Sequence, residues 1–342
     1  MNILLVGYDS PGALEGYCAA ALRRLGCPVE VFNLAVEYAK HRRLATVPLA
    51  GAIEQRRLLK RVNKRLLAVV KDSQPDVLLA FKGMEVLPDT LETIRGITNR
   101  PLLVNWNPDS PFDSAPSNSS PDLLKGIPLY DVYFIWDRDL FGPLREVGAR
   151  RVEYLPFGYD AASHFPANLT PAERDQLASD VCFVGGYTRQ RADRLARLMH
   201  HRVGIWGPNW EHLPAGHPVE KALRGGFTHD AGMSRIFSAA GVVMNFIRPQ
   251  NGQAHNMRTF EAPATGALMI STRTRDQMKW LPEDEAAAYF DSPEEMVERA
   301  DTYLANAEWR KAVAAEGYRR ITTGGHSYDD RMKQLVATIE EM

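Results

Sequence analysis

The sequence contains few cysteines, no long apolar run and almost no net charge. Its three cysteines, an odd number without metal-ligand spacing, argue against a disulfide framework and favour a reducing compartment. No apolar run approaches the roughly 20 residues that span a bilayer. The first residues, MNILLVGYD, predict a strand rather than a secretory signal. A formal net charge of −1 gives no reason to expect nucleic acid as a partner. We therefore expect a cytoplasmic protein, soluble or at most peripheral.

The turn after the first strand also lacks a familiar motif. It carries Gly7 and Gly12 but not the G-x-G-x-x-G string of dinucleotide-binding proteins. It favours a plain tight turn, although an approach of acceptor or phosphate to the strand end stays open. The chain has no internal repeat and no low-complexity tract, which leaves an ordinary globular protein of two domains.

What the sequence does contain is a regular alternation of strands and helices. Short apolar runs separated by helical spacing predict a parallel α/β architecture. The predicted strands are residues 2–6, 29–32, 77–81, 102–106, 132–135, 152–155, 180–184, 203–206, 242–246, 267–270 and 287–290. Pro and Gly cluster between residues 155 and 166, which predicts a domain boundary there.

The most informative stretch is 245–271, NFIRPQNGQAHNMRTFEAPATGALMIS. It predicts a strand, a polar loop, a short helix capped by Asn256 and ended by Gly266, and a second strand. Pro263 inside the helix should bend or shorten it. Arg258 and the free N–H groups of the first turn suit phosphate, and Glu261 one turn later suits the vicinal diol of a ribose. An ordinary amphipathic helix with a surface Arg and Glu is the alternative.

The same residues resemble a known family. The string N-x-R-x-F-E-A-x-A-x-G, from Asn256 to Gly266, resembles the donor-site signature of CgeB-like glycosyltransferases of the GT-B group. Further similar stretches are LPFGYD before His164, DVCFVGGYTRQR from Asp180 and GIWGPNW from Gly204.

The resemblance implies two Rossmann-like domains facing across a cleft. An acceptor-binding domain would span residues 1–166 and a nucleotide-sugar-binding domain residues 167–326, with a helix at 327–342 packing back on the first domain. It implies a hexosyltransferase-type enzyme that moves a sugar from a nucleoside-diphosphate sugar to a saccharide, protein or lipid-linked acceptor. GT-B enzymes typically need no bound metal, so we expect no metal and no cofactor.

The resemblance also implies the residues that hold the donor. Two glycines after the strand ending at residue 184 permit close backbone approach. Arg189 is predicted to meet the pyrophosphate, whereas Arg191 is equally open to phosphate or solvent. Trp206 and Gly207 would line the base pocket, although plain core is an alternative for Trp206. The predicted nucleotide-binding set is Glu261, Arg258, Asn256, Gly185, Gly186, Arg189, Trp206 and Gly207.

For the donor sugar, the resemblance implies Gln253 and His255. Many retaining GT-B enzymes carry Glu-x7-Glu, and counting back from Glu261 gives Gln253 instead of glutamate. Glutamine offers no negative charge to an oxocarbenium-like centre, which puts retention of configuration in doubt.

Two loops that follow strands in the first half point to the acceptor. Ligands bind beyond the carboxyl ends of strands in open α/β sheets. Lys82 follows one strand, and Asp109 and Asp113 follow the next. Asp109 is the predicted base for the acceptor hydroxyl, with Arg258 as the other catalytic residue. The alternative is that Asp109 caps a turn in a Pro-rich loop.

Other readings of the chain stay open. The basic stripe on the helix at 52–71 predicts either a solvated face or weak contact with an anionic membrane surface. The alternatives to a transferase are a nucleotide-sugar-binding module without catalysis and a GT-B-type sugar-nucleotide epimerase.

Overall fold

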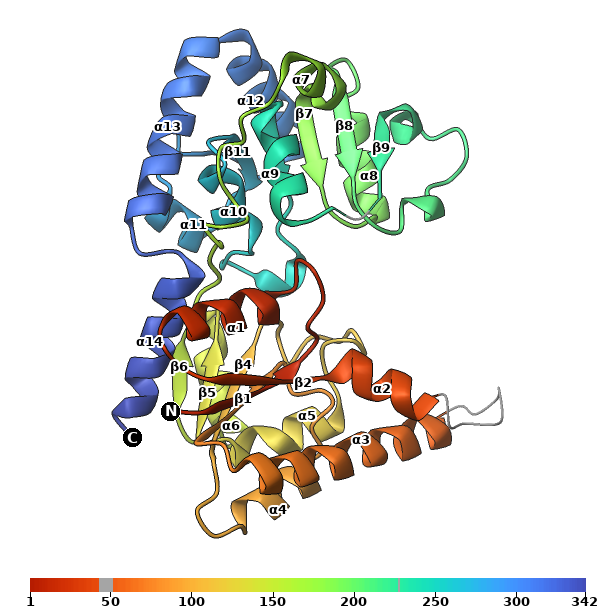
Figure 1. The fold of residues 1–342 in the computed structure, drawn as a ribbon. Coiled ribbons are helices and arrows are strands. Elements are labelled where there is room, and N and C mark those ends of the chain that lie inside the picture. Colours follow the sequence, from red (N-terminus) through yellow and green to blue (C-terminus); the bar gives the residue numbers. More distant parts are fainter. Residues whose placement is uncertain (43–51, 227) are drawn as a thin grey trace. The chain divides into compact units, whose positions relative to one another are not determined.

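The computed structural model describes residues 1–42, 52–226 and 228–342. The chain divides into two units: Met1–Pro156 with Arg331–Met342 form unit 1, and Phe157–Asp330 form unit 2 (Figure 1). The sequence placed these limits after residues 166 and 326, whereas the units divide after Pro156 and Asp330.

Unit 1 is built on a six-stranded parallel sheet in the described residues, in the order β2-β1-β3-β4-β5-β6. Its strands are β1 (Ile3–Gly7), β2 (Val29–Asn33), β3 (Val77–Phe81), β4 (Leu102–Asn107), β5 (Val132–Ile135) and β6 (Val152–Tyr154). Its helices are α1 (Leu14–Arg24), α2 (Leu34–Arg42), α3 (Ala52–Ser73), α4 (Pro88–Arg95), α5 (Pro121–Gly126), α6 (Phe141–Glu146) and the greater part of α14 (Tyr328–Glu340).

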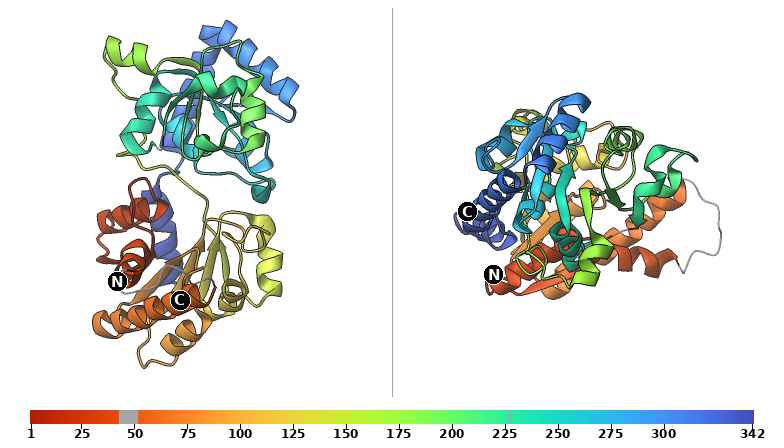
Figure 2. Two further views of the ribbon diagram at one scale, coloured as in Figure 1. Left: turned by 90° about the vertical axis from the view of Figure 1, so that its right-hand side faces the viewer. Right: turned by 90° about the horizontal axis from the view of Figure 1, so that it is seen from above.

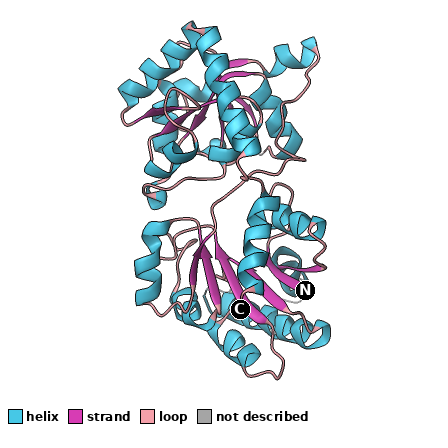
Figure 3. Ribbon diagram, turned by 90° about the vertical axis from the view of Figure 1, so that its left-hand side faces the viewer, coloured by secondary structure: helices cyan, strands magenta, loops and turns pink. Residues whose placement is uncertain are grey.

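Helices cover both faces of this sheet (Figures 1 and 3). Every residue of β1 and β3 is therefore buried, which explains why these strands read as unbroken apolar runs. In α3, Val62, Leu66 and Val70 face the core, whereas Arg56 pairs with Asp122. Figures 1 and 2 show α14 beside the sheet, where the Gln334 carboxamide donates to the Tyr154 carbonyl at 2.7 Å.

Unit 2 repeats the architecture, with the strand order β12-β11-β10-β7-β8-β9. Its strands are β7 (Ser179–Val184), β8 (Val203–Trp206), β9 (Leu223–Gly225), β10 (Ala240–Asn245), β11 (Leu268–Thr272) and β12 (Ala288–Phe290). Its helices are α7 (Pro171–Leu177), α8 (Arg189–Ala196), α9 (Asp230–Ser238), α10 (Arg258–Ala264), α11 (Arg275–Trp280), α12 (Pro293–Ala305) and α13 (Ala307–Thr323).

One face of the unit 2 sheet carries a large buried cluster of apolar side chains. Ile205 and Met244 are buried there, and Phe183 packs against Phe246 with ring centroids 5.3 Å apart. At the end of α10, Gly266 adopts a φ of +74°, as the predicted helix stop requires. The helix has seven residues and includes Pro263, which agrees with the predicted shortening.

Candidate active site

The sheet of unit 2 has a point where its strand order reverses. From β7 the chain moves to β8 on one side, and it later returns to place β10 on the other side of β7. In open α/β sheets, ligands bind at the carboxyl ends of the strands beside such a point. The loops that begin at Gly185, Gly207 and Phe246 leave the sheet at this edge.

Two glycine loops pack directly against each other at this edge. Gly207 has a φ of +145°, and a Cβ atom on it would lie 2.1 Å from the Gly185 carbonyl oxygen. The Gly185 N–H donates to the Trp206 carbonyl at 2.8 Å. Trp206 itself is 6% exposed, and its ring lies against Gly204 and Gly225 on the face of the sheet. The two glycines therefore let the loops pack directly against each other, while Trp206 packs as a core residue.

Arg258 connects α10 to the end of β7. Its Nη1 lies 2.5 Å from Glu261 Oε2, and its Nη2 donates to the Val184 carbonyl at 3.3 Å. Glu261 is only 4% exposed, and its other oxygen lies 3.7 Å from His164 Nε2. Burial, followed by the charge of Arg258, lowers the pKa of His164, while Glu261 opposes that shift. The Glu261 carboxylate is thus held by a cation rather than open to solvent, and its ribose contact stays a prediction.

Arg191 binds the loop that follows the same strand that Arg258 contacts. Arg191 donates from Nη1 to the Gly186 carbonyl at 2.8 Å, and its guanidinium lies 5.5 Å from the Phe183 ring centroid. Burial lowers the pKa of Arg191 to about 10, and the charges of Arg248 and Arg258 add to the shift. Arg258 is paired with Glu261 and Arg248 is exposed, so the unfavourable environment is that of Arg191, which a bound anion would relieve. The cluster of Arg191, Arg248 and Arg258 is therefore suited to a polyanion.

Arg189, the arginine singled out from the sequence, lies apart from this cluster. Its side chain is 82% exposed and lies 3.8 Å from Asp193. It lines a separate surface pocket together with Tyr187 and His217. The predicted contact of Arg189 with the pyrophosphate stays a prediction, whereas Arg191, the other arginine named from the sequence, faces the glycine loop.

The remaining predicted donor residues organise the loop after β10. The carboxamides of Asn256 and Asn245 exchange two hydrogen bonds at 2.8 and 3.1 Å, and Asn256 Oδ1 also accepts from the Thr259 N–H. Gln253 accepts from the Arg275 N–H at 3.1 Å and so supports the start of α11.

His255 is fully buried, and its Nε2 accepts from the Phe157 N–H at 3.2 Å. Its ring packs among those of Phe157, Phe260 and Trp280. In this structure, therefore, His255 fixes the loop from inside and offers no ring surface to a sugar.

In unit 1 the three predicted acceptor residues come together. Lys82 Nζ lies 2.8 Å from Asp109 Oδ2 and 2.9 Å from Asn118 Oδ1. Asn118 donates in turn to Asp113 at 2.7 Å. The turn itself is capped by Asn107, whose side-chain oxygen accepts from the Asp109 N–H at 3.0 Å. The Asp109 side chain is thus part of a polar network beyond the ends of β3 and β4.

The sequence did not predict a second group of polar side chains that the structure brings together in unit 1. The strand order of this sheet reverses between β1 and β3, and Tyr8 and Glu85 follow these strands. The Tyr8 hydroxyl donates to Glu85 at 3.0 Å, and the Tyr8 N–H donates to Glu15 at 3.2 Å. Burial raises the pKa of both carboxyl groups. Only the topology brings these residues together, although the position of Glu85 in a loop directly after a strand was a usable signal.

Comparisons with known proteins agree on the fold. A family model described as "Glycosyl transferase-like" matches residues 189–337. The sucrose-phosphate synthase of Thermosynechococcus elongatus aligns at a TM-score of 0.75 and 11% identity, over 100% of this chain and 98% of that one. Anabaena Alr3699/HepE in complex with UDP-glucose aligns at a TM-score of 0.67 and 15% identity, over 100% of both chains.

A third structure, the E. coli trehalose-6-phosphate protein bound with UDP-2-fluoro glucose, aligns at a TM-score of 0.68 and 13% identity, over 100% of this chain and 99% of that chain. No curated protein matches the chain. The chain therefore has the α/β fold of GT-B glycosyltransferases and carries a glycosyltransferase-like domain in its C-terminal half. None of the described helices combines the length and apolarity needed to cross a bilayer.

Proposed function

We propose that this protein transfers a sugar from a nucleoside-diphosphate sugar to an acceptor hydroxyl. The observation that carries the proposal is that the Arg191 and Arg258 guanidinium groups bind the Gly186 and Val184 carbonyls, beside two glycine loops at the reversal point of the unit 2 sheet. The guanidinium groups of such a place bind the diphosphate and stabilise it as it departs.

Glu261 is proposed to bind the ribose after a local exchange of partners. In the structure, Arg258 is paired with this carboxylate. When a diphosphate arrives, the Arg258 guanidinium turns part of its donor set to phosphate. A Glu261 oxygen then accepts from the ribose hydroxyls. The pair thus keeps Arg258 in position until the donor binds.

UDP is the first nucleotide to test. Anabaena HepE was solved with UDP and with UDP-glucose, and the S. aureus MnaA structure also holds UDP. All of them are distant in sequence, so the choice of UDP is a proposal for this chain. A titration with UDP, GDP, dTDP and CMP measures the preference directly.

Unit 1 is proposed to bind the acceptor and, in an inverting reaction, to supply the base. Asp109 would take the proton of the acceptor hydroxyl while the oxygen attacks the anomeric carbon. The bond from that carbon to the diphosphate then breaks, and the nucleoside diphosphate leaves. Glu85 is the competing base, because burial raises its pKa and so suits proton uptake nearer neutral pH.

Exchange of each carboxyl group for an amide separates these two bases. Asp109→Asn should lower transfer by about 100-fold or more while UDP affinity stays unchanged. Glu85→Gln serves as the matched comparison. If Asp109→Asn transfers normally and Glu85→Gln does not, then Glu85 is the base.

The transfer is proposed to need no bound metal, with the arginine cluster taking that role. The sequence contains an Asp-x-Asp string, a pattern that can bind a metal, at Asp137-Arg138-Asp139. In the structure, the Asp137 carboxylate accepts a hydrogen bond from the Asp139 backbone N–H at 2.9 Å.

The CgeB-like relationship and a cytoplasmic location remain part of the proposal. Three free cysteines support a reducing compartment.

One incubation distinguishes the three functions that the sequence left open. The protein is incubated with UDP-sugars, with and without a panel of acceptors, and UDP and sugar products are followed. A transferase releases UDP faster when an acceptor is present. An epimerase changes the sugar without an acceptor, and a binding module changes nothing. Either of the last two outcomes would overturn the proposal.

A further inference from the structure

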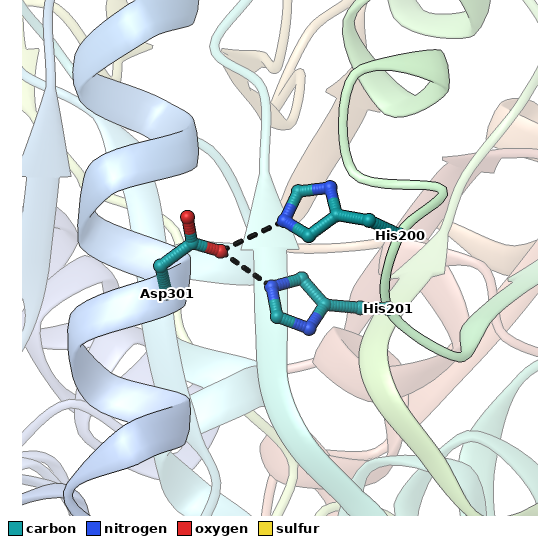
Figure 4. A group of neighbouring side chains, drawn as sticks. All are labelled: His200, His201 and Asp301. Atoms are coloured by element: carbon teal, nitrogen blue, oxygen red, sulfur yellow. Dashed lines mark hydrogen bonds and ion pairs between the residues drawn. The ribbon is translucent and has the colours of Figure 1, made fainter.

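A cluster of metal-ligand side chains lies at the other edge of the unit 2 sheet. His200 and His201 directly precede β8, and Asp301 comes from α12 (Figure 4). The Nε2 atoms of His200 and His201 lie 2.9 and 2.5 Å from Asp301 Oδ1. Because these histidines stand before a strand and the arginine cluster follows strands, the sheet separates the two groups.

The geometry of the cluster fits a single cation. One ligand atom from each residue lies within 4.8 Å of the other two, and the imidazole centroids are 4.2 Å apart. Among the described residues, this is the one such group of three His, Cys, Asp or Glu side chains. The side chains of His200 and Asp301 are half exposed and that of His201 is 19% exposed, so an ion and its remaining water ligands have access.

The charge of the cluster also suits a cation. It offers the carboxylate of Asp301 next to the imidazole rings of His200 and His201. Two imidazole nitrogens and one carboxylate oxygen form a mixed ligand set that Zn²⁺ and Ni²⁺ accept. Mg²⁺ and Ca²⁺ prefer sets made wholly of oxygen.

We propose that His200, His201 and Asp301 bind one first-row transition-metal ion, with Zn²⁺ as the type case. The ion takes a lone pair from each Nε2, whose proton moves to solvent or to Nδ1, and it takes one carboxylate oxygen. Water fills the remaining position. The ion joins the segment before β8 to α12 and so stabilises unit 2 without touching the donor. The inference does not depend on the proposed transfer reaction.

The test uses the full chain without a histidine tag, after treatment with EDTA and removal of the chelator. Calorimetric titration with ZnCl2 should show one ion per chain, and His200→Ala and Asp301→Asn should each weaken the affinity more than about tenfold. His212→Ala is the matched control, because this exposed histidine lies 3.9 Å from Glu211 and outside the cluster. Its affinity should equal that of the unchanged protein.

A melting experiment keeps the test independent of any single variant. ZnCl2 should raise the Tm of the unchanged protein and leave that of His200→Ala/His201→Ala where it was, while MgCl2 raises neither. Three results overturn the inference: no zinc binding by the unchanged protein, equal zinc binding by the double variant, or equal binding of Mg²⁺ and Zn²⁺. Equal binding by the double variant would mean that the ion binds to other side chains.

Discussion

Arg191→Gln is expected to weaken donor binding without weakening the fold. The surroundings of the Arg191 side chain disfavour its positive charge and would favour a bound anion. Burial, followed by the charges of Arg248 and Arg258, lowers the pKa of Arg191 to about 10. A cation whose pKa is lowered in the folded state destabilises that state at every pH well below the lowered value. The cost is therefore fully present at neutral pH.

The magnitudes follow from the contacts. The lowered pKa corresponds to at most about 3 kcal/mol, and less after screening by solvent. Glutamine loses the hydrogen bond to Gly186, worth about 1 kcal/mol. It also loses the contact with Phe183, worth about 0.5–1 kcal/mol. The free energy of unfolding should stay the same or rise by about 1 kcal/mol. A lost charge-assisted bond to phosphate costs about 1.5–3 kcal/mol, which raises the Kd for UDP about ten- to a hundredfold.

The assay compares two substitutions in the same helix. Urea unfolding gives the stability and calorimetry gives the Kd for UDP, for Arg191→Gln and for Arg189→Gln. Arg189 is 82% exposed and lies outside the cluster, so its variant should change neither quantity. If Arg191→Gln binds UDP like the unchanged protein, or if both variants lose affinity equally, the arginine cluster does not hold the diphosphate.

Three further substitutions test the surroundings. Glu261→Ala leaves the Arg258 guanidinium without its carboxylate partner, so the free energy of unfolding should fall by about 3–5 kcal/mol. UDP should also no longer raise the Tm of this variant. A Tm rise with UDP equal to that of the unchanged protein would show that Glu261 is not part of the site. Gly207→Ala should lower the Tm strongly, because its Cβ would meet the Gly185 carbonyl, and an unchanged Tm would contradict the described turn. Burial raises the pKa of Glu85, so its stabilising contribution is complete below the ordinary value of 4.5 and is lost as pH rises through the raised value. Glu85→Gln should therefore be more stable than the unchanged protein at pH 7 by urea unfolding, with a difference that shrinks toward acid pH; an equal difference at both pH values would refute the assigned burial.

Much of the fold was readable from the sequence because parallel strands covered on both faces leave apolar runs. The strands at 77–81, 132–135 and 203–206 were predicted with the bounds that the structure gives. The sequence missed β9, since Leu-Arg-Gly has neither the length nor the apolar pattern of a buried strand. The α/β class and the two parallel sheets are confirmed.

The site was less predictable, because it depends on which residues the fold brings together. The spacing of Arg258 and Glu261 allowed their pairing, but the burial of Glu261 depends on the elements packed around α10. Arg248 lies in a loop with no periodic signal. Glu15 and Glu85 are far apart in the chain, and the fold brings both to Tyr8, beside the reversal in strand order. Their roles in binding and catalysis stay predictions.

The most direct test of the account is a crystal structure of the protein with UDP. The diphosphate is predicted to lie within hydrogen-bonding distance of the Arg191 and Arg258 guanidinium groups, beside Gly185 and Gly186, with the ribose hydroxyls on Glu261. A diphosphate bound anywhere else, or a Glu261 carboxylate still paired only with Arg258 and remote from the ribose, would contradict it.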